Sequence, residues 1–362
     1  LLFLIIGFLF FMRARRVTIQ DIANHVGMSI GMVSSVLGRK SYCTASDSTR
    51  ELIESAADEL GYRPNLLARS LKDGRSHIVG FICESAQNEV SSQQIVYLTN
   101  ALLPYGYQVQ VIYSRGEPKL RKLAYNRFVD SGCDAVIISG GFSKLDFPVL
   151  VPTVGISNSA DSESLDNVVF IDYRTGVIEA LDHLRDSGHQ NIFLAAMYWS
   201  TFFTDQRKLA FDEYMQKLEP AAENIADRTL IFQKFEEITG QNISRFLEQH
   251  PDCTAFLCTN DLVAMKIIQA LSEISLSVPE DFSVIGFDDI ITADFFIPRL
   301  SSIRKPGEKI MEEAVKLLIN KLENKNHSIK KSVPCHLIKR DSVAAAKKKE
   351  VIVNFSKEGV LK

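Results

Sequence analysis

The sequence lacks the patterns that define several common protein classes. Its six cysteines are scattered and form no C-x-x-C pair, so neither a disulfide framework nor a metal site is predicted. The formal net charge is only −3, and no strong overall field attracts the chain to nucleic acid or to a membrane. No apolar run approaches the roughly 20 residues that span a bilayer.

Signatures of common enzyme classes are also missing. The chain has no phosphate-binding P-loop, no G-x-G-x-x-G after a strand and no G-x-S-x-G nucleophile elbow. Its serine, histidine and aspartate residues occur at spacings that specify no catalytic arrangement. We therefore expect no enzyme activity, no catalytic residues and no cofactor.

What is present is an ordinary globular composition with an uneven charge. The 362 residues are 46% hydrophobic and 23% charged, which suits two or three domains. Residues 13–77 carry ten basic and seven acidic side chains, whereas the remainder carries 31 and 37. A small basic N-terminal segment therefore precedes an acidic body.

The first 11 residues are almost wholly apolar and are followed by Met12 and a short arginine-rich run. This length is about half of a membrane span, and a signal peptide would place its basic residues before the apolar run. We expect residues 1–11 to be a non-native upstream extension and Met12 to be the start. The alternative is an anchor or signal of an extracytoplasmic protein.

Residues 18–37 have the pattern of a helix-turn-helix. Thr18 and Asp21 have the spacing of a capping box, and the apolar residues of 19–26 recur on one helix face. Gly27 ends that helix, and Ser29 can cap a second helix that buries its valines and Leu37. A tight bend of this kind presents the second helix outward.

A third helix is predicted from a second capping box at residues 48–51, and it ends at Gly61. Its predicted buried side chains are Leu52, Ile53, Ala56, Ala57 and Leu60. From these patterns alone, a generic small helical bundle remains an alternative.

Beyond residue 76, apolar β-branched runs alternate with stretches of helical length. The predicted strands are residues 77–83, 107–113, 134–140, 152–157, 167–172, 191–196, 254–259 and 282–288. This alternation indicates parallel sheets with helices on both faces. The strands are too many for one small sheet, so two α/β lobes with a cleft between them are predicted. The segment 300–304 and the helix 307–322 return the chain to the first lobe.

The strings VTIQDIANHVGMSIGMVSSVL (residues 17–37) and STRELIESAADELGYRPNLLARSL (residues 48–71) resemble the LacI/GalR (lactose-repressor/galactose-repressor) family of bacterial transcriptional regulators. Thr259-Asn260-Asp261 and the strings at 284–289 and 339–342 extend the resemblance to about residue 343. It implies an N-terminal all-α helix-turn-helix domain followed by an α/β two-lobed body like that of periplasmic binding proteins.

The resemblance implies five segments. They are the extension 1–11, a DNA-binding domain at 12–62, a hinge helix and linker at 63–76, an effector-binding and dimerisation body at 77–343, and a tail at 344–362. The two lobes would comprise roughly 77–173 with 304–330, and 174–303.

The resemblance also implies the positions that contact DNA. They are Thr18, Ser29, Ile30, Gly31, Ser34, Ser35 and Arg39 in the first domain, and Asn65, Ala68 and Leu71 in the hinge. Leu71 would be wedged between bases in the minor groove. Two departures from the family pattern are Met32 in place of threonine and Ser35 in place of a frequent arginine. An arginine there could read guanine with two hydrogen bonds, so the operator differs from the commonest one.

In the body, the resemblance implies a sugar-like effector in the cleft. Arg207 would be a bidentate donor with Asp288 as its acceptor partner. The other effector positions are Asn260 and Asp261, Phe170 and Phe235 as an aromatic wall, and Ser157 where the family usually has an acidic or amide residue. For Arg207 and Asp288, the alternative is a purely structural ion pair.

The leading hypothesis is a cytoplasmic transcriptional regulator, a repressor, whose affinity for double-stranded operator DNA is controlled by a sugar or sugar phosphate. It would act as a homodimer, because a two-fold symmetric protein reads a pseudo-palindromic operator. The main alternative is a membrane-tethered or secreted sugar-binding receptor that uses the apolar N-terminus as its signal.

Overall fold

The computed structural model describes residues 17–38, 43–63, 74–84, 89–141, 145–157, 165–198, 205–218, 228–325 and 327–347. The chain divides into two compact units, Leu1–Ser76 and His77–Lys362. Some predicted features lie outside the described residues, namely residues 1–16, Arg39, Asn65, Ala68, Leu71 and the end of the tail.

The described part of the first unit contains the helices α2 (Ile19–Val26), α3 (Ile30–Leu37) and α4 (Asp47–Glu59). The predicted capping box is present, because the Thr18 hydroxyl accepts from the Asp21 amide and the Asp21 carboxylate accepts from the Thr18 amide. Gly27 ends α2 with a φ of 67°, and the Ser29 hydroxyl caps α3. The predicted helix-turn-helix is confirmed.

The start of α4 differs from the prediction. Ser46, not Ser48, is the N-cap, and its hydroxyl accepts from the amide of Thr49. Leu52 is 50% exposed, although it was predicted to be buried. The buried face of α4 is centred on Ile53 and Ala56, and Leu52 precedes Ile53 by one position, which turns its side chain away from this face.

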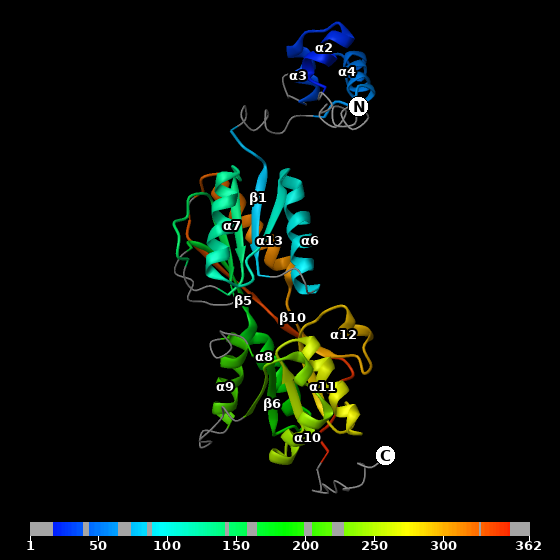
Figure 1. The fold of residues 1–362 in the computed structure, drawn as a ribbon, viewed down its shortest axis with the longest axis vertical. Coiled ribbons are helices and arrows are strands. Elements are labelled where there is room, and N and C mark those ends of the chain that lie inside the picture. Colours follow the sequence, from blue (N-terminus) through cyan, green and yellow to red (C-terminus); the bar gives the residue numbers. More distant parts are fainter. Residues whose placement is uncertain are drawn as a thin grey trace, which may run out of the picture. The chain divides into compact units, whose positions relative to one another are not determined.

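The second unit contains two lobes, each built on a six-stranded sheet (Figure 1). The first sheet has the order β11-β5-β4-β3-β1-β2 and is parallel throughout. Its strands are β1 (Ile78–Cys83), β2 (Gln108–Tyr113), β3 (Ala135–Ser139), β4 (Thr153–Ser157), β5 (Asn167–Asp172) and β11 (Ile329–Pro334).

The second sheet has the order β12-β10-β9-β8-β6-β7, and only β12 runs antiparallel to its neighbour. Its strands are β6 (Ile192–Met197), β7 (Thr229–Phe232), β8 (Ala255–Cys258), β9 (Ser283–Asp288), β10 (Ser301–Arg304) and β12 (His336–Ile338). The predicted fold class is confirmed. The strands β7, β11 and β12 were not predicted, because they are short or rich in polar residues.

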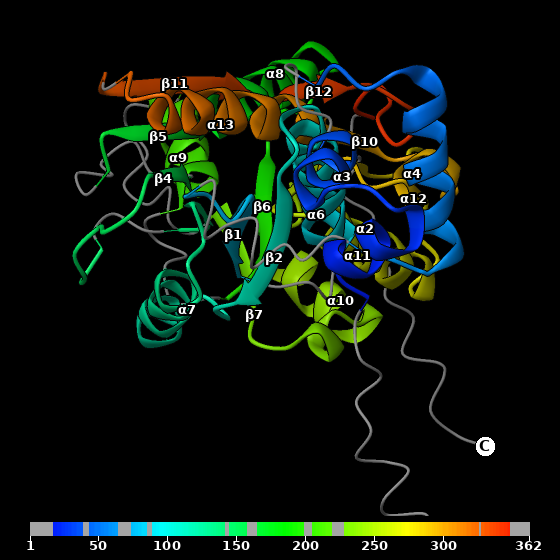
Figure 2. The same ribbon diagram turned by 90° about the horizontal axis from the view of Figure 1, so that it is seen from above.

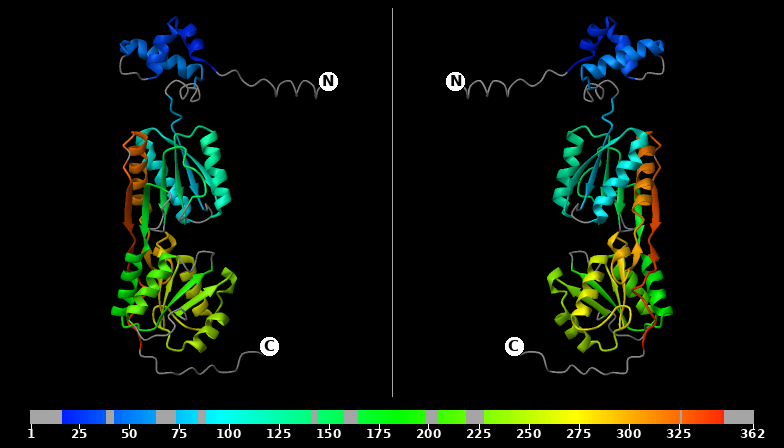
Figure 3. Two further views of the ribbon diagram at one scale, coloured as in Figure 1. Left: turned by 90° about the vertical axis from the view of Figure 1, so that its left-hand side faces the viewer. Right: turned by 90° about the vertical axis from the view of Figure 1, so that its right-hand side faces the viewer.

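Helices cover both faces of each sheet (Figures 2 and 3). In the first lobe, α6 (Glu89–Leu102) packs beside α13 (Gly307–Leu322), while α7 (Pro118–Asp130) covers the other face. In the second lobe, α8 (Tyr173–Asp186) pairs with α9 (Gln206–Leu218), and α10 (Gly240–Gln249) pairs with α11 (Asp261–Glu273). None of the described helices is long and apolar enough to cross a bilayer.

The chain passes between the lobes at three places: after Asp172, after Arg304 and after Pro334. A single apolar cluster extends through both lobes on the side of α8 and α13. The carboxyl ends of the parallel strands of both sheets face the region between the lobes, where this topology places ligands.

Replacing Gly80 by alanine should lower the free energy of unfolding of the second unit by about 1–3 kcal/mol, the usual cost of overfilling a packed core. Gly80 lies within β1, and a Cβ atom there would be 2.5 Å from ring carbons of the buried Phe128. Urea unfolding measures the change.

The control is Gly31→Ala in the first unit, where a Cβ atom meets only the Ser29 hydroxyl at 4.0 Å. This variant should leave the transition of the second unit unchanged. Equal unfolding midpoints for wild type and Gly80→Ala would contradict the packing described.

Candidate functional site

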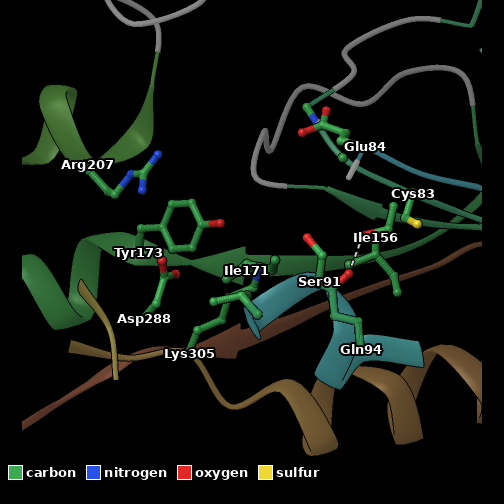
Figure 4. Close-up of a pocket in the computed structure, with 14 residues that line it drawn as sticks. Cys83, Glu84, Ser91, Gln94, Ile156, Ile171, Tyr173, Arg207, Asp288 and Lys305 are labelled. Carbon is green, nitrogen blue, oxygen red and sulfur yellow. Dashed lines mark hydrogen bonds between the residues drawn. The ribbon is translucent and has the colours of Figure 1, made fainter. Parts of the chain in front are cut away.

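A cavity of about 240 Å³ lies between the lobes at the carboxyl ends of the strands (Figure 4). The first lobe contributes the ends of β1 and β3 and the start of α6, and the second contributes Arg207 and Asp288. The lining residues are Cys83, Glu84, Val90, Ser91, Gln94, Ser139, Gly140, Gly141, Ile156, Ile171, Tyr173, Arg207, Asp288 and Lys305. The lining is mostly polar and is of a size that suits a small ligand.

Arg207 enters this cavity from the first turn of α9. Its Nε and Nη2 donate to the two carboxylate oxygens of Asp205 at 2.8 and 2.9 Å, and its Nη1 donates to the carbonyl of Thr259 at 2.7 Å. Burial lowers the pKa of Arg207, but the hydrogen bonds and charge of Asp205 outweigh burial and leave it raised. The guanidinium is therefore a fixed, fully charged donor.

The alternative interpretation of Arg207 and Asp288, a structural ion pair between them, was wrong. The guanidinium is paired with Asp205, two residues before it in the chain, and not with Asp288. The reason is local: an aspartate just before the helix accepts from both the backbone amide and the guanidinium of Arg207. An Asp-x-Arg spacing at a helix start was the signal that the sequence offered.

Asp288 and Lys305 point into the same cavity from the end of β9 and from the segment after β10 (Figure 4). Neither the Asp288 carboxylate nor the Lys305 ammonium makes a side-chain hydrogen bond or ion pair with a described residue. Burial raises the pKa of Asp288 and lowers that of Lys305, while each group's charge acts against the shift of the other. Both groups line the cavity, where a ligand can reach them.

Opposite them, the first lobe presents polar side chains and two glycines. The Glu84 carboxylate accepts from the amide of Gly141 at 2.8 Å, and the buried Gln94 side chain accepts from the Ser139 hydroxyl at 3.3 Å. Gly140 has a φ of 144°, and a Cβ atom there would lie 2.4 Å from Glu84. Glycine is required at this position for the close approach.

The turn after β9 has an unusual backbone. Asp288 and Asp289 have φ angles of 97° and 56°, which residues other than glycine rarely adopt. The Asp289 side chain is only 3% exposed and lies 2.6 Å from Arg304 Nε and 2.7 Å from Arg340 Nη1. A buried carboxylate paired with two arginines holds this backbone in place.

The same turn also contacts the first lobe. The amide of Ile291 donates to the carboxylate of Glu89, the first residue of α6, at 2.8 Å. Arg304 precedes one passage between the lobes, and Arg340 follows another. Residues 288–291 therefore join the cavity, two connecting segments and the opposite lobe.

Asn260 and Asp261, both predicted to contact an effector, do not line this cavity. Asn260 caps α11 by accepting from the amide of Val263 at 2.8 Å. Asp261 is buried and accepts from the Ser302 hydroxyl and from the amide of Ile290. Burial raises the pKa of Asp261 to about 7. Both residues support the turn that carries Asp288.

The predicted aromatic wall is also absent from this cavity. Phe170 packs with the apolar cluster on the α7 side, opposite to its neighbour Ile171, because successive strand residues face opposite sides. Phe235 is 39% exposed in a short helix at residues 235–237, and Ser157 is fully buried at the end of β4. Among the described residues, the aromatic side chain that lines the cavity is that of Tyr173, which directly follows β5.

Of the predicted DNA-contact residues of the first unit, Ser29, Ile30, Gly31, Ser34 and Ser35 lie on or next to α3. Ile30 and Gly31 are exposed, as is the capping Ser29, whereas Ser34 and Ser35 are half-buried. Thr18 is exposed, and its hydroxyl is engaged in the capping box of α2.

The described residues contain no group of three or more histidine, cysteine, aspartate or glutamate side chains that could hold a metal ion. All six cysteines are free thiols, and five of them are buried.

Family comparisons match both units. Residues 18–65 match the family described as bacterial regulatory proteins, lacI family. Residues 181–343 match the periplasmic binding protein-like domain family.

Similar proteins cover nearly the whole chain. The HTH-type transcriptional regulator AscG of Escherichia coli is 27% identical over 91% of this chain and 98% of its own length. The HTH-type transcriptional repressor PurR of Photobacterium profundum is 26% identical over 86% of this chain and 93% of its own.

Among solved structures, the Lac repressor dimer bound to operator and the anti-inducer ONPF is similar in fold. Its TM-score is 0.77 at 23% identity, over 91% of this chain and 100% of that chain.

Asp261 should make stability depend on pH. Its folded pKa of about 7 lies above its ordinary value of 3.8, so the folded state holds a proton that the unfolded state releases. The contribution of Asp261 to the free energy of unfolding is fully present below about pH 4 and is lost as pH rises through 7. Over that range the free energy of unfolding falls by at most about 1.4 kcal/mol per pH unit. Urea unfolding of wild type and Asp261→Asn at several pH values from 5 to 8 measures this contribution.

The free energy of unfolding of wild type, relative to that of Asp261→Asn, should fall over this range and level off above pH 7. A difference that stays constant with pH would show that Asp261 is already ionised in the folded protein at the lowest pH tested.

Proposed function

We propose that this chain, which belongs to the LacI family of bacterial regulatory proteins, is a DNA-binding transcriptional repressor whose operator affinity is set by a small effector. The observation that carries the proposal is that one chain combines an exposed helix-turn-helix with a body whose cavity presents Asp288 and Lys305 to a ligand. Its relatives AscG and PurR are a regulator and repressors by name.

The first unit supplies the DNA-contact surface. The second helix of a helix-turn-helix lies in the major groove, and the N-terminal residues of that helix approach the bases. In this chain those residues are Ser29, Ile30 and Gly31, with Thr18, Ser34 and Ser35 nearby. We assign Arg39 and the hinge residues Asn65, Ala68 and Leu71 to DNA contact on the family resemblance alone. Such a regulator acts where the chromosome is, so we expect it in the cytoplasm.

The cavity between the lobes supplies the effector site. The fixed donor Arg207, the acceptor Asp288 and the donor Lys305 match a small ligand rich in hydroxyl or phosphate oxygens, such as a sugar or sugar phosphate. Such a ligand changes DNA affinity only if it binds two conformations of the body unequally. The turn at 288–291 contacts both lobes and is therefore the element that senses the ligand.

Binding to genomic DNA fragments tests the proposal that the protein recognises an operator sequence. Full-length protein should enrich fragments that share a pseudo-palindromic sequence, and raising the salt concentration should weaken binding steeply because phosphate contacts dominate affinity. Retention of no fragment at about 100 mM salt would overturn the proposal.

Effector control is tested on the enriched fragments with a panel of neutral sugars and their phosphate esters. At least one compound should raise the melting temperature of the protein and change its DNA affinity. Asp288→Ala should still bind DNA but lose at least about tenfold in affinity for that compound, because a truncated polar contact leaves its partner unpaired. If Asp288→Ala binds the compound as tightly as wild type does, Asp288 is not part of the effector site.

We also propose that the body forms a homodimer through the side of α6 and α12 (Thr292–Phe295), which lie on the same side of the body in Figure 1. Large exposed apolar side chains gather on these elements and beside them: Val96, Leu103, Tyr105, Ile291, Phe295 and Ile297. Ile297 is 89% exposed. An apolar surface of this kind favours burial against a second copy.

Phe295→Glu should weaken self-association at least about tenfold, because an unpaired charge would be buried in an apolar interface. Sedimentation velocity over a range of concentrations measures the change. Leu150→Glu is the matched control, since Leu150 is 66% exposed and lies near α7, where the amide of Leu150 donates to the Tyr125 hydroxyl. Equal effects of the two variants, or a monomeric wild type, would contradict this dimer.

A further inference from the structure

The helix that faces DNA in the proposed function carries none of the charged or amide side chains that most often read bases. Its sequence, residues 30–37, is IGMVSSVL. It contains no arginine or lysine to read guanine, no asparagine or glutamine to read adenine, and no carboxylate to read cytosine. Base recognition by α3 is therefore left to its serines and its apolar side chains.

Two large apolar side chains flank the outward face of α3. Val33 and Val36 are completely buried against α2 and α4, which fixes the orientation of the helix. Ile30 is 48% exposed and Met32 is 36% exposed. These are the large side chains that α3 presents to solvent in its first turn.

The small residues of α3 lie between these two side chains. Gly31 and Ser35 are one turn apart, on the side opposite to Val33 and Val36. The Ser35 hydroxyl donates to the carbonyl of Gly31 at 2.7 Å, so its proton is used within the helix. A Cβ atom at Gly31 would meet only the Ser29 hydroxyl, at 4.0 Å. Because these residues are small, the backbone of α3 can come close to the floor of the major groove. The side chains of Ile30 and Met32 then lie on either side of this contact.

We propose that Ile30 and Met32 determine the operator specificity by packing on the C5-methyl groups of thymine in the major groove. This inference rests on the proposed function, since it requires α3 to enter DNA. The thymine methyl is the one apolar group that base pairs display in the major groove, and apolar side chains are its natural partners. Half-sites should therefore be defined by thymines and not by guanines.

The test replaces single thymines by uracil, which removes only the methyl group and keeps every hydrogen-bonding group. Fragments enriched by the full-length protein supply the duplexes. In each half-site, uracil at the contacted positions should weaken binding about fourfold per methyl group, which is the worth of burying one such group. Fluorescence anisotropy at constant salt measures the affinities.

Variants separate a direct contact from an effect of the methyl group on DNA shape. Ile30→Ala and Met32→Ala should each weaken binding to the thymine duplex and lose discrimination against uracil at one position. Both alanines favour the helix, so the domain should fold. Leu52→Ala is the matched control, because Leu52 is an exposed apolar residue on α4. It should discriminate as wild type does.

The outcomes distinguish this inference from the proposed function. A protein that selects a clear operator but binds every uracil-substituted half-site as tightly as thymine overturns the inference and leaves the repressor intact. Discrimination that persists in the Ile30→Ala, Met32→Ala double variant also overturns it. Failure to select any sequence overturns the proposed function, and the inference with it.

Discussion

The buried carboxylate of Asp289, held between Arg304 and Arg340, is the interaction on which the geometry of the cavity depends. A buried carboxylate is tolerated only when it is paired, so the two arginines fix its position. The turn that carries Asp289 has left-handed backbone at two successive aspartates. The first of them, Asp288, is the last residue of β9 and lines the cavity. Asp261 and Ser302 hold the turn by hydrogen bonds. The Asp261 carboxylate accepts from the amide of Ile290, and the Ser302 hydroxyl accepts from the amide of Asp289.

The two units differ in the kind of surface that they offer to a partner. The described helices of the first unit enclose a small core and expose a short helix whose outer face is free to meet a partner. The second unit buries two large sheets and keeps its charged, ligand-accessible groups in one cavity. The surface proposed to bind DNA and the cavity proposed to bind a small molecule therefore belong to two units with separate cores.

Much of the fold could be predicted from sequence because it follows from local chemistry. The capping box at Thr18, the stop at Gly27 and the alternation of apolar strands with helices all depend on residues close in the chain. The errors have equally local causes. Ser46 caps α4 ahead of the predicted start, and β11, an edge strand with lysines, lacks the apolar run of a buried strand.

The cavity was predicted only in part, because its membership depends on strand parity and on contacts between distant segments. Arg207 and Asp288 were predicted to lie in it, and they do, whereas the alternative of an ion pair between them was wrong, because Arg207 pairs with Asp205. Phe170 lies one position from the cavity-facing Ile171, and that single step directs it to the other face of the sheet. Lys305 and Tyr173 follow strand ends directly, which was the signal available for them. The apolar cluster that extends through both lobes has a further consequence: it joins the lobes on the side of α8 and α13, so a rearrangement that separated them on this side would expose core residues to water.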